Sequence, residues 1–372
     1  MSYTEPVGHK SMLRDEVRNR CYRAALSRLL TPDSVVLDLG AGTGILGLMA
    51  ASLGAARVYQ VEPATPLEVS MELAEANGLG DKIVPLAGRI QEVELPEQVD
   101  VILSVFTGNF LLDEDLLPSL FYARDQYLKP GGVLLPDRAR MWCAPVAMPG
   151  FYADMIDCWL DDQFGLSHAE LRKYAVNTVY HQHFDLHPHE LLAAPAMLQT
   201  IDFNLADEAS CRASLQFRLS ESAGIHGFLG WFDMQLDKNW LGTGPADEPT
   251  HWSQVFLPVD PVLRLEAGAL LALEIDRPEF GEWSWRWQHG DQSAQHSVFL
   301  SRPFTPAALG RRAEGYQPQL SGQGEMAKWV LRHMDGSRTV ADLAEGLVRD
   351  LGHPDARQAE TFVRHLIDGF GE

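Results

Sequence analysis

The chain has 372 residues, of which 46% are hydrophobic and 22% are charged, as in an ordinary folded protein. This length exceeds that of one average core, so two or three domains are expected. The 51 acidic and 30 basic residues give a formal net charge of −21. Such a surface repels nucleic acid phosphates and attracts cationic substrates, although plain solubility is the simpler explanation of the charge. We therefore expect no nucleic-acid partner.

Neither a membrane segment nor a targeting signal is expected. The apolar stretch Gly268 to Ile275 is far too short to span a bilayer, and residues Met1 to Lys10 lack the apolar region of a signal peptide. The four cysteines are scattered and form no Cys-x-x-Cys pair: Cys21, Cys143, Cys158 and Cys211. This pattern favours reduced thiols in a cytoplasm and argues against a disulfide or zinc framework.

Residues from about Ser34 to Pro136 alternate between strand and helix patterns, which predicts a parallel sheet covered on both faces. The expected strands are Val35 to Leu39, Arg57 to Glu62, Ile83 to Leu86, Val99 to Ser104 and Val133 to Leu135. The expected helices are Gly44 to Leu53, Leu67 to Asn77 and Glu114 to Leu128. Lys129-Pro130-Gly131-Gly132 is expected to form a turn before the last strand.

After Pro136 the pattern changes. Period-two alternation between Ala196 and Phe304 predicts an antiparallel β domain, and Phe151 to Ala175 has the apolar spacing of a helical region. Beyond Pro318, three short amphipathic helices are expected: Glu325 to His333, Val340 to Leu351 and Gln358 to Ile367. The second of them would be capped by Ser337 or Thr339.

A glycine-rich motif, Asp38-Leu39-Gly40-Ala41-Gly42-Thr43-Gly44, follows the first strand and precedes a helix. Its G-x-G-x-G spacing differs from the G-x-G-x-x-G of dinucleotide sites. Glu62 ends the next strand, where its carboxylate can accept both ribose hydroxyls. The combination predicts a site for S-adenosylmethionine, whose methionine tail has no pyrophosphate for a helix N-terminus to hold. The alternatives are a dinucleotide enzyme or a glycine turn without a ligand.

From about Ser2 to Gln288, the sequence resembles the protein arginine methyltransferase family. The stretches that carry the resemblance are Met12 to Arg18, Leu95-Pro96, Leu135 to Ala139, Trp231 to Asp233 and Thr250-His251-Trp252. The resemblance implies a Rossmann-like α/β domain followed by an antiparallel β-barrel domain. It also implies a dimerisation arm at Phe151 to Asp185, and hence a head-to-tail homodimer.

We therefore expect four parts in the chain. They are an S-adenosylmethionine-binding Rossmann-like domain with an N-terminal helix (1–137), a β-barrel substrate domain (138–304) with its arm at about 151–185, a linker (305–318) and a helical module (319–372).

The family resemblance also implies the roles of individual side chains. Arg18 would hold the cofactor carboxylate, a task that suits bidentate arginine pairing. The cofactor site would further include Asp38, Gly40, Gly42, Glu62, Ile90 and Gln91, with Gln91 standing where the family usually has an adenine-contacting glutamate. The catalytic residues would be Glu114, His251 and Asp15, and the substrate would contact Met12, Val105, Phe106 and Trp252. An equally weighted alternative is that His251 and Asp15 form a structural pair bridging two domains.

One departure from the family concerns the acceptor. The family grips a guanidinium with two glutamates of one loop; here Glu114 matches the second, and Val105 stands in place of the first. A guanidinium arrives charged, and losing one carboxylate partner costs roughly 2–5 kcal/mol. Three outcomes are open: Asp113 or Asp115 substitutes, the acceptor is a less charged nucleophile, or the site is inactive.

We accordingly expect a methyltransferase acting on a peptide or protein acceptor that need not be a conventional arginine. The alternatives are a catalytically silent S-adenosylmethionine-binding scaffold with a peptide-binding tail, or a small-molecule N- or O-methyltransferase of natural products.

The C-terminal segment and a histidine-rich segment suggest further binding functions. Gln319 to Phe370 resembles the winged-helix modules of the PqqD family, which bind leader peptides, through Asp335 to Val340 and Leu343-Ala344. A plain three-helix accessory domain is the equal alternative. The histidines of His181-Gln182-His183 and His187-Pro188-His189 lack the partner ligands of a metal site, so no metal is expected.

Overall fold

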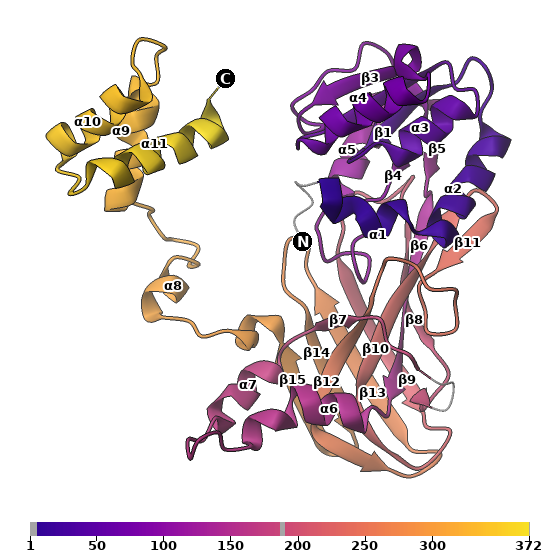
Figure 1. Ribbon diagram of the computed structural model, residues 1–372. Coiled ribbons are helices and arrows are strands. Elements are labelled where there is room, and N and C mark those ends of the chain that lie inside the picture. Colours follow the sequence, from indigo (N-terminus) through magenta and orange to yellow (C-terminus); the bar gives the residue numbers. More distant parts are fainter. Residues whose placement is uncertain (1–5, 187–189, 372) are drawn as a thin grey trace. The chain divides into compact units, whose positions relative to one another are not determined.

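A computed structural model of the chain describes residues 6–186 and 190–371. The chain divides into two compact units, Met1–Arg302 and Pro303–Glu372, which are taken in turn (Figure 1). Among the described residues, no helix combines the length and apolarity that crossing a membrane requires.

The first unit begins with a parallel sheet whose strand order is β3-β2-β1-β4-β5. Its strands are β1 (Val35–Leu39), β2 (Arg57–Glu62), β3 (Ile83–Ala87), β4 (Val99–Ser104) and β5 (Leu128–Leu135). Every residue of β1 is buried, because helices pack around this central strand. The helices of this part are α1 (Lys10–Leu13), α2 (Glu16–Leu29), α3 (Ile45–Ser52), α4 (Pro66–Ala76) and α5 (Leu117–Tyr127), with short 3₁₀ turns at Pro6–His9 and Gly80–Lys82. The expected Rossmann-like α/β architecture is confirmed.

Two local expectations in this domain were wrong. The segment Lys129 to Gly132 is not a separate turn but lies inside β5, where the pairing with β4 shifts register. Gly131 adopts a φ of +80° there, which a glycine tolerates, so the strand absorbs the irregularity. Helix α5 begins at Leu117 rather than at Glu114, because Asp115 has a left-handed φ of +52° that no α-helix accommodates.

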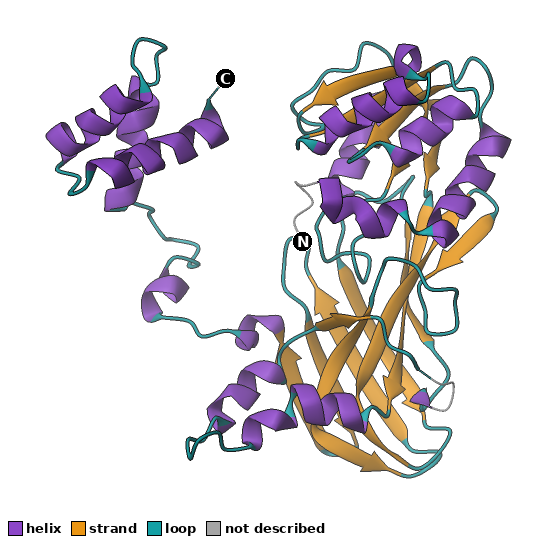
Figure 2. Cartoon of the chain, in the orientation of Figure 1, coloured by secondary structure: helices purple, strands orange, loops and turns teal. Residues whose placement is uncertain are grey.

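The second part of this unit is built from two antiparallel sheets, which Figure 2 shows as one block of strands. One sheet has the order β7-β12-β10-β6-β8, with β11 added on β10, and the other has the order β15-β14-β13-β9. The strands are β6 (Arg138–Val146), β7 (Tyr180–Gln182), β8 (Ala196–Asp202), β9 (Cys211–Arg218), β10 (Ala223–Leu236), β11 (Asn239–Gly242), β12 (Gln254–Leu265), β13 (Leu270–Arg277), β14 (Ser284–His289) and β15 (Gln292–Ser297). Alternate residues of β13 are buried, as the period-two pattern predicted.

The arm between β6 and β7 is less regular than expected. It consists of α6 (Pro149–Met155), 3₁₀ turns at Asp157–Leu160 and Ala169–Leu171, and α7 (Arg172–Ala175). A tight turn at its tip carries Phe164 and Gly165, both with positive φ, and interrupts the helical pattern. Arg172 ties the arm to the barrel by donating to Asp260 at 2.8 Å.

The second unit contains α8 (Pro306–Gly310), α9 (Gly322–His333), α10 (Val340–Leu351) and α11 (Ala356–Phe370). Helices α9, α10 and α11 enclose a small apolar core centred on Val330, Leu347 and Val363. Thr339 rather than Ser337 caps α10, in a capping box with Asp342. Residues 303–371 contain no strand, so the wing of a winged-helix module is not among them, and the resemblance to the PqqD family stays a prediction.

Candidate functional site

A cavity of about 620 Å³ lies where the glycine-rich motif leaves the end of β1. Ligands of open parallel sheets bind at the carboxyl ends of the strands, so this position is the expected one. Four segments meet around the cavity: the N-terminal helices, the glycine loop with Glu62, the loop after β4, and the loop before β12. The cavity therefore draws its wall from both the parallel-sheet domain and the barrel.

Two glycines of the loop are required by their backbone conformation and by the close approach of neighbouring side chains. Gly40 and Gly42 have φ values of +70° and +54°, in the left-handed region that other residues avoid. A Cβ atom on Gly40 would lie 2.3 Å from the ring of Phe106, and one on Gly42 would lie 2.6 Å from the ring of His9. The loop thus lets two aromatic side chains close directly onto the backbone.

Two carboxylates fix this loop. Glu62 accepts from the backbone N–H of Gly42 at 2.9 Å through one oxygen and from that of Ala64 at 3.0 Å through the other. Asp38 accepts from the N–H of Gly47 at 2.8 Å, and burial raises the pKa of Asp38 to about 6. Each oxygen of Glu62 keeps lone-pair capacity for a hydroxyl donor, so the carboxylate can bind a diol while it braces the turn.

Arg18 is a buried cation whose partners are neutral. It is 1% exposed, and its guanidinium donates to the carbonyl of Met12 at 2.8 Å and to the amide oxygen of Asn19 at 2.8 and 3.0 Å. Burial lowers the pKa of Arg18, and within the described part of the chain no carboxylate lies at ion-pair distance from it. A buried guanidinium facing a cavity favours an anionic ligand group such as a carboxylate.

Several residues that the sequence did not single out line the cavity, His9 among them, and two predicted residues lie outside its wall. His9, buried against Gly42, lines the cavity, although no sequence pattern marked it; it reaches the glycine loop only once the N-terminal segment has folded over it. Ile90 is buried outside the cavity wall, and Gln91 is exposed and donates to the hydroxyl of Ser119 at 3.0 Å. Their cofactor contacts stay predictions.

The loop after β4, residues Val105 to Leu116, is here called the acceptor loop. Its cavity-lining members are Val105, Phe106, Thr107, Asn109, Glu114 and Leu116. Asp113 and Asp115 do not line the cavity; they turn to the barrel, where Asp113 accepts from Trp283 at 2.5 Å and Asp115 accepts from Arg277 at 2.8 Å. Burial raises the pKa of Asp113. In this structure neither aspartate lies in the cavity wall with Val105 and Glu114, so their substitution for a first glutamate stays a prediction.

His251 and Asp15 pair across the two domains. Asp15 caps α2 and accepts from both the backbone N–H of His251 at 2.7 Å and its Nδ1 at 2.8 Å. Burial lowers the pKa of His251, and the hydrogen bond with Asp15 offsets part of this shift. Burial would raise the pKa of Asp15, but its hydrogen bonds to His251 and Arg18 outweigh burial and lower that pKa. The imidazole is thus neutral near pH 7, with Nδ1–H donating to Asp15 and Nε2 left as an acceptor.

Trp252 joins the same wall. It is 3% exposed, stacks near His251 with 3.9 Å between ring centroids, and donates its indole N–H to the carbonyl of Thr107 at 2.7 Å. Met12, Val105 and Phe106 complete the side of the cavity assigned to substrate. The structure therefore brings together the predicted residues of both half-sites, except for Ile90 and Gln91.

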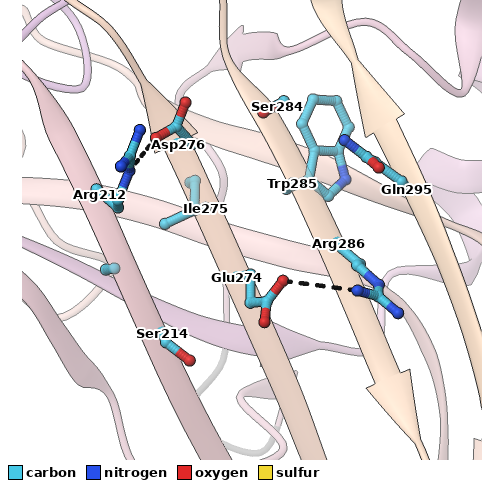
Figure 3. A pocket seen from close by; sticks show the side chains of 10 residues that line it. Arg212, Ser214, Glu274, Ile275, Asp276, Ser284, Trp285, Arg286 and Gln295 are labelled. Carbon is cyan, nitrogen blue, oxygen red and sulfur yellow. Dashed lines mark hydrogen bonds and ion pairs between the residues drawn. The ribbon is translucent and has the colours of Figure 1, made fainter.

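Other clusters lie outside this cavity. A hollow of about 550 Å³ on the outer face of the four-stranded sheet is lined by ion-paired side chains, Arg212 with Asp276 and Arg286 with Glu274 (Figure 3). His181 lies 3.4 Å from Asp113, whereas His187 and His189 lie outside the described residues. Among residues 6–186 and 190–371, no three side chains are grouped as metal ligands.

Two family descriptions match the chain. "Arginine methyltransferase oligomerization subdomain" matches residues 137–288, and "Ribosomal protein L11 methyltransferase (PrmA)" matches residues 20–135. The Arabidopsis thaliana "Probable protein arginine N-methyltransferase 1.2" is 34% identical over 276 residues, 72% of this chain and 75% of that protein. The Xenopus laevis "Protein arginine N-methyltransferase 6" is 32% identical over 277 residues, 71% of this chain and 81% of that protein.

Solved structures agree. A chain of the Trypanosoma brucei PRMT1 enzyme-prozyme heterotetrameric complex with AdoHcy superposes with a TM-score of 0.74 at 26% identity, covering 80% of this chain and 100% of that one. Arabidopsis thaliana protein arginine methyltransferase 10 gives a TM-score of 0.69 at 27% identity, covering 80% and 99%. Fold and sequence together define an S-adenosylmethionine-dependent methyltransferase. Within that class, the chain belongs to the protein arginine methyltransferase family.

Proposed function

We propose that the protein transfers a methyl group from S-adenosylmethionine to a peptide or protein acceptor, and that the acceptor group need not be a conventional arginine. The proposal that the acceptor need not be arginine rests on the side chains of the acceptor loop. Of its three acidic residues only Glu114 lines the cavity, while Val105 presents an apolar side chain in the same wall.

The residues present fit the cofactor. Arg18 supplies a buried cation for its carboxylate, the glycine loop allows close approach of its backbone, and Glu62 offers acceptors for the ribose hydroxyls. S-adenosylmethionine supplies an electrophilic methyl group on a sulfonium centre. The related Trypanosoma brucei complex contains AdoHcy, which supports the same ligand class here.

The acceptor half supplies positioning and one negative charge. Glu114 would accept hydrogen bonds from an N–H of the acceptor, and the apolar wall of Val105 and Phe106 would exclude water from the attacking atom. As the new bond to the methyl carbon forms and the bond to sulfur breaks, the acceptor loses a proton. His251 lines the cavity and is hydrogen-bonded to Asp15 through Nδ1, so it would take that proton through Nε2, and Asp15 would stabilise the imidazolium.

A single carboxylate changes which acceptors bind well. A guanidinium has five N–H donors and a full charge, and one carboxylate satisfies only one edge of it. The unpaired edge would face Val105, so arginine is a poorer fit than in a site with two carboxylates. A neutral or smaller nucleophile, such as an amide, an imidazole or an amine, leaves fewer donors unsatisfied.

The test is a transfer assay with radiolabelled S-adenosylmethionine. One peptide scaffold would carry arginine, lysine, histidine or glutamine at a single position, and a panel of small metabolites would be assayed beside it. Transfer to a peptide, strongest at a residue other than arginine, is the expected result. Preferential transfer to arginine would overturn the altered acceptor, and transfer to metabolites alone would favour the small-molecule alternative. Tight AdoHcy binding without transfer would favour the silent scaffold.

We also propose a homodimer formed through the arm. The arm tip exposes three apolar side chains, Leu160 at 55%, Phe164 at 101% and Leu166 at 65%, which favour burial against another surface. The Trypanosoma brucei relative is a heterotetramer of enzyme and prozyme, so a second, different chain is the alternative occupant. Light scattering of the purified protein distinguishes a dimer from a monomer. A cytoplasmic location, inferred from the cysteines, remains part of this proposal.

A further inference from the structure

The acceptor loop is fastened to the barrel at both ends. Near its start, Thr107 accepts from the indole of Trp252 at 2.7 Å, and Asn109 accepts from the backbone N–H of Ser253 at 3.0 Å. Near its end, Asp113 and Asp115 bind a different barrel segment, the connection between β13 and β14. Glu114 lies between these two aspartates in the chain.

The contacts at the far end form one compact cluster. Trp283 donates to Asp113 while its ring lies 4.8 Å from the ring of Phe110, centroid to centroid. Arg277, 3% exposed, donates to Asp115, and its guanidinium carbon lies 5.8 Å from the centroid of the Trp283 ring. Asp115 additionally accepts from the backbone N–H of Phe280 at 3.1 Å. Two aspartates, one arginine and one tryptophan thus share a single anchoring point.

The loop backbone needs such an anchor. Phe110, Leu111 and Asp115 all have left-handed φ values, of 47°, 65° and 52°. Bulky residues rarely adopt this region, and such a backbone persists only where surrounding contacts hold it. Phe110 and Leu111 are fully or almost fully buried, so packing holds the middle of the loop, whereas Glu114 near its end is exposed.

We propose that Asp113 and Asp115 are positioning residues that hold Glu114 at the cofactor cavity. The two aspartates bind the barrel and anchor the loop, whereas Glu114 between them lines the cavity and binds the acceptor. Asp113 also lies 3.4 Å from His181 of β7, the strand that follows the arm, which braces the same anchor from a third segment. This inference rests on the proposed function, in which Glu114 binds the acceptor.

The experiment compares Asp113→Ala and Asp115→Ala with a matched control, Asp276→Ala. Asp276 also pairs with an arginine of the barrel, but its side chain lies on the outer sheet face shown in Figure 3, opposite to the buried side chain of its neighbour Arg277. Amide hydrogen exchange of residues 105–116, AdoHcy affinity by calorimetry, and kcat and KM for the best acceptor peptide are measured on the full chain.

In both anchor variants, residues 108–116 are expected to exchange about tenfold faster or more, as expected of local opening. The value of kcat is expected to fall about 100-fold, because a displacement of about 1 Å at the acceptor is enough for that loss. AdoHcy affinity should stay within about threefold, since the anchor does not touch the cofactor side. Asp115→Asn, whose amide oxygen still accepts from Arg277 or Phe280, should recover part of kcat.

The outcomes separate the two proposals. If the wild-type protein methylates nothing, the proposed function fails, while the exchange of the acceptor loop still decides whether the aspartates anchor it. Equal loop exchange and equal kcat in the anchor variants and in Asp276→Ala would overturn the positioning role. Should the alanine variants fail to fold, Trp283→Phe keeps an aromatic ring beside Phe110 and removes the indole N–H together with part of the ring system. An unchanged loop and unchanged kcat in that variant would overturn the role equally.

Discussion

The cofactor side and the acceptor side of the cavity differ in how their lining residues are brought together. On the cofactor side, the determinants are short and local: a glycine loop at the end of one strand, an acid at the end of the next, and an arginine on the preceding helix. On the acceptor side, each lining residue depends on contacts with distant segments, such as Trp252 with Thr107. One cavity therefore has a wall whose residues come from short sequence motifs and a wall whose residues are assembled by long-range contacts.

The largest effect should come from the cofactor side. Arg18→Met removes the buried cation and is expected to weaken AdoHcy binding by about 30-fold or more, because loss of one partner of a buried charge pair costs about 2–5 kcal/mol. Isothermal calorimetry measures the change. Arg23→Met on the exposed face of the same helix is the control and should leave the affinity unaltered. Equal affinities for both variants would show that Arg18 is structural.

On the acceptor side, Val105→Glu should restore the second carboxylate. Methylation of an arginine peptide is expected to rise about 10- to 1,000-fold in kcat/KM, since a charged partner for the guanidinium contributes roughly 2–4 kcal/mol. Val105→Gln has a similar size without the charge and should give little gain. If glutamate and glutamine variants behave alike, charge at this position is not what limits arginine methylation.

A smaller effect is expected on the pH dependence of stability, through the His251–Asp15 pair that joins the two domains. Burial lowers the pKa of folded His251, so the unfolded chain takes up the proton first as the pH falls below about 6.5. The free energy of unfolding should therefore decrease with falling pH in that range, by on the order of 1 kcal/mol for each pKa unit of difference. Denaturant unfolding of His251→Asn, which keeps a donor for Asp15, should show a shallower pH dependence. His289→Asn, at an exposed histidine, should match the wild type.

The smallest effect is expected at the edge of the cofactor side. Gln91 is exposed and is held by Ser119 rather than by the cavity wall. Gln91→Ala should therefore change AdoHcy affinity by less than about tenfold, the loss of at most one neutral hydrogen bond. A larger loss, measured by calorimetry beside Ser119→Ala, would mean that this segment closes onto the adenine when the ligand binds.

The sequence by itself determined the architecture of the parallel sheet and the cofactor motif. Strands such as Arg57–Glu62 and Val99–Ser104 were predicted with their observed bounds, because short segments rich in β-branched and other apolar residues between turn residues are a local signal. The glycine loop and Glu62 were recognisable for the same reason: each lies at the end of its own strand, and adjacent strands bring those ends together.

Only the tertiary structure decided which side chains share the cavity. Asp113, Glu114 and Asp115 are consecutive and chemically alike, yet barrel contacts from Trp283 and Arg277 turn two of them away. His9 joins the wall because a glycine leaves room for its ring, a contact that no spacing in the sequence encodes. The late start of α5 follows from the left-handed backbone of Asp115, which contacts with Arg277 and Phe280 hold. The arm is interrupted by a local, exposed turn at Phe164 and Gly165.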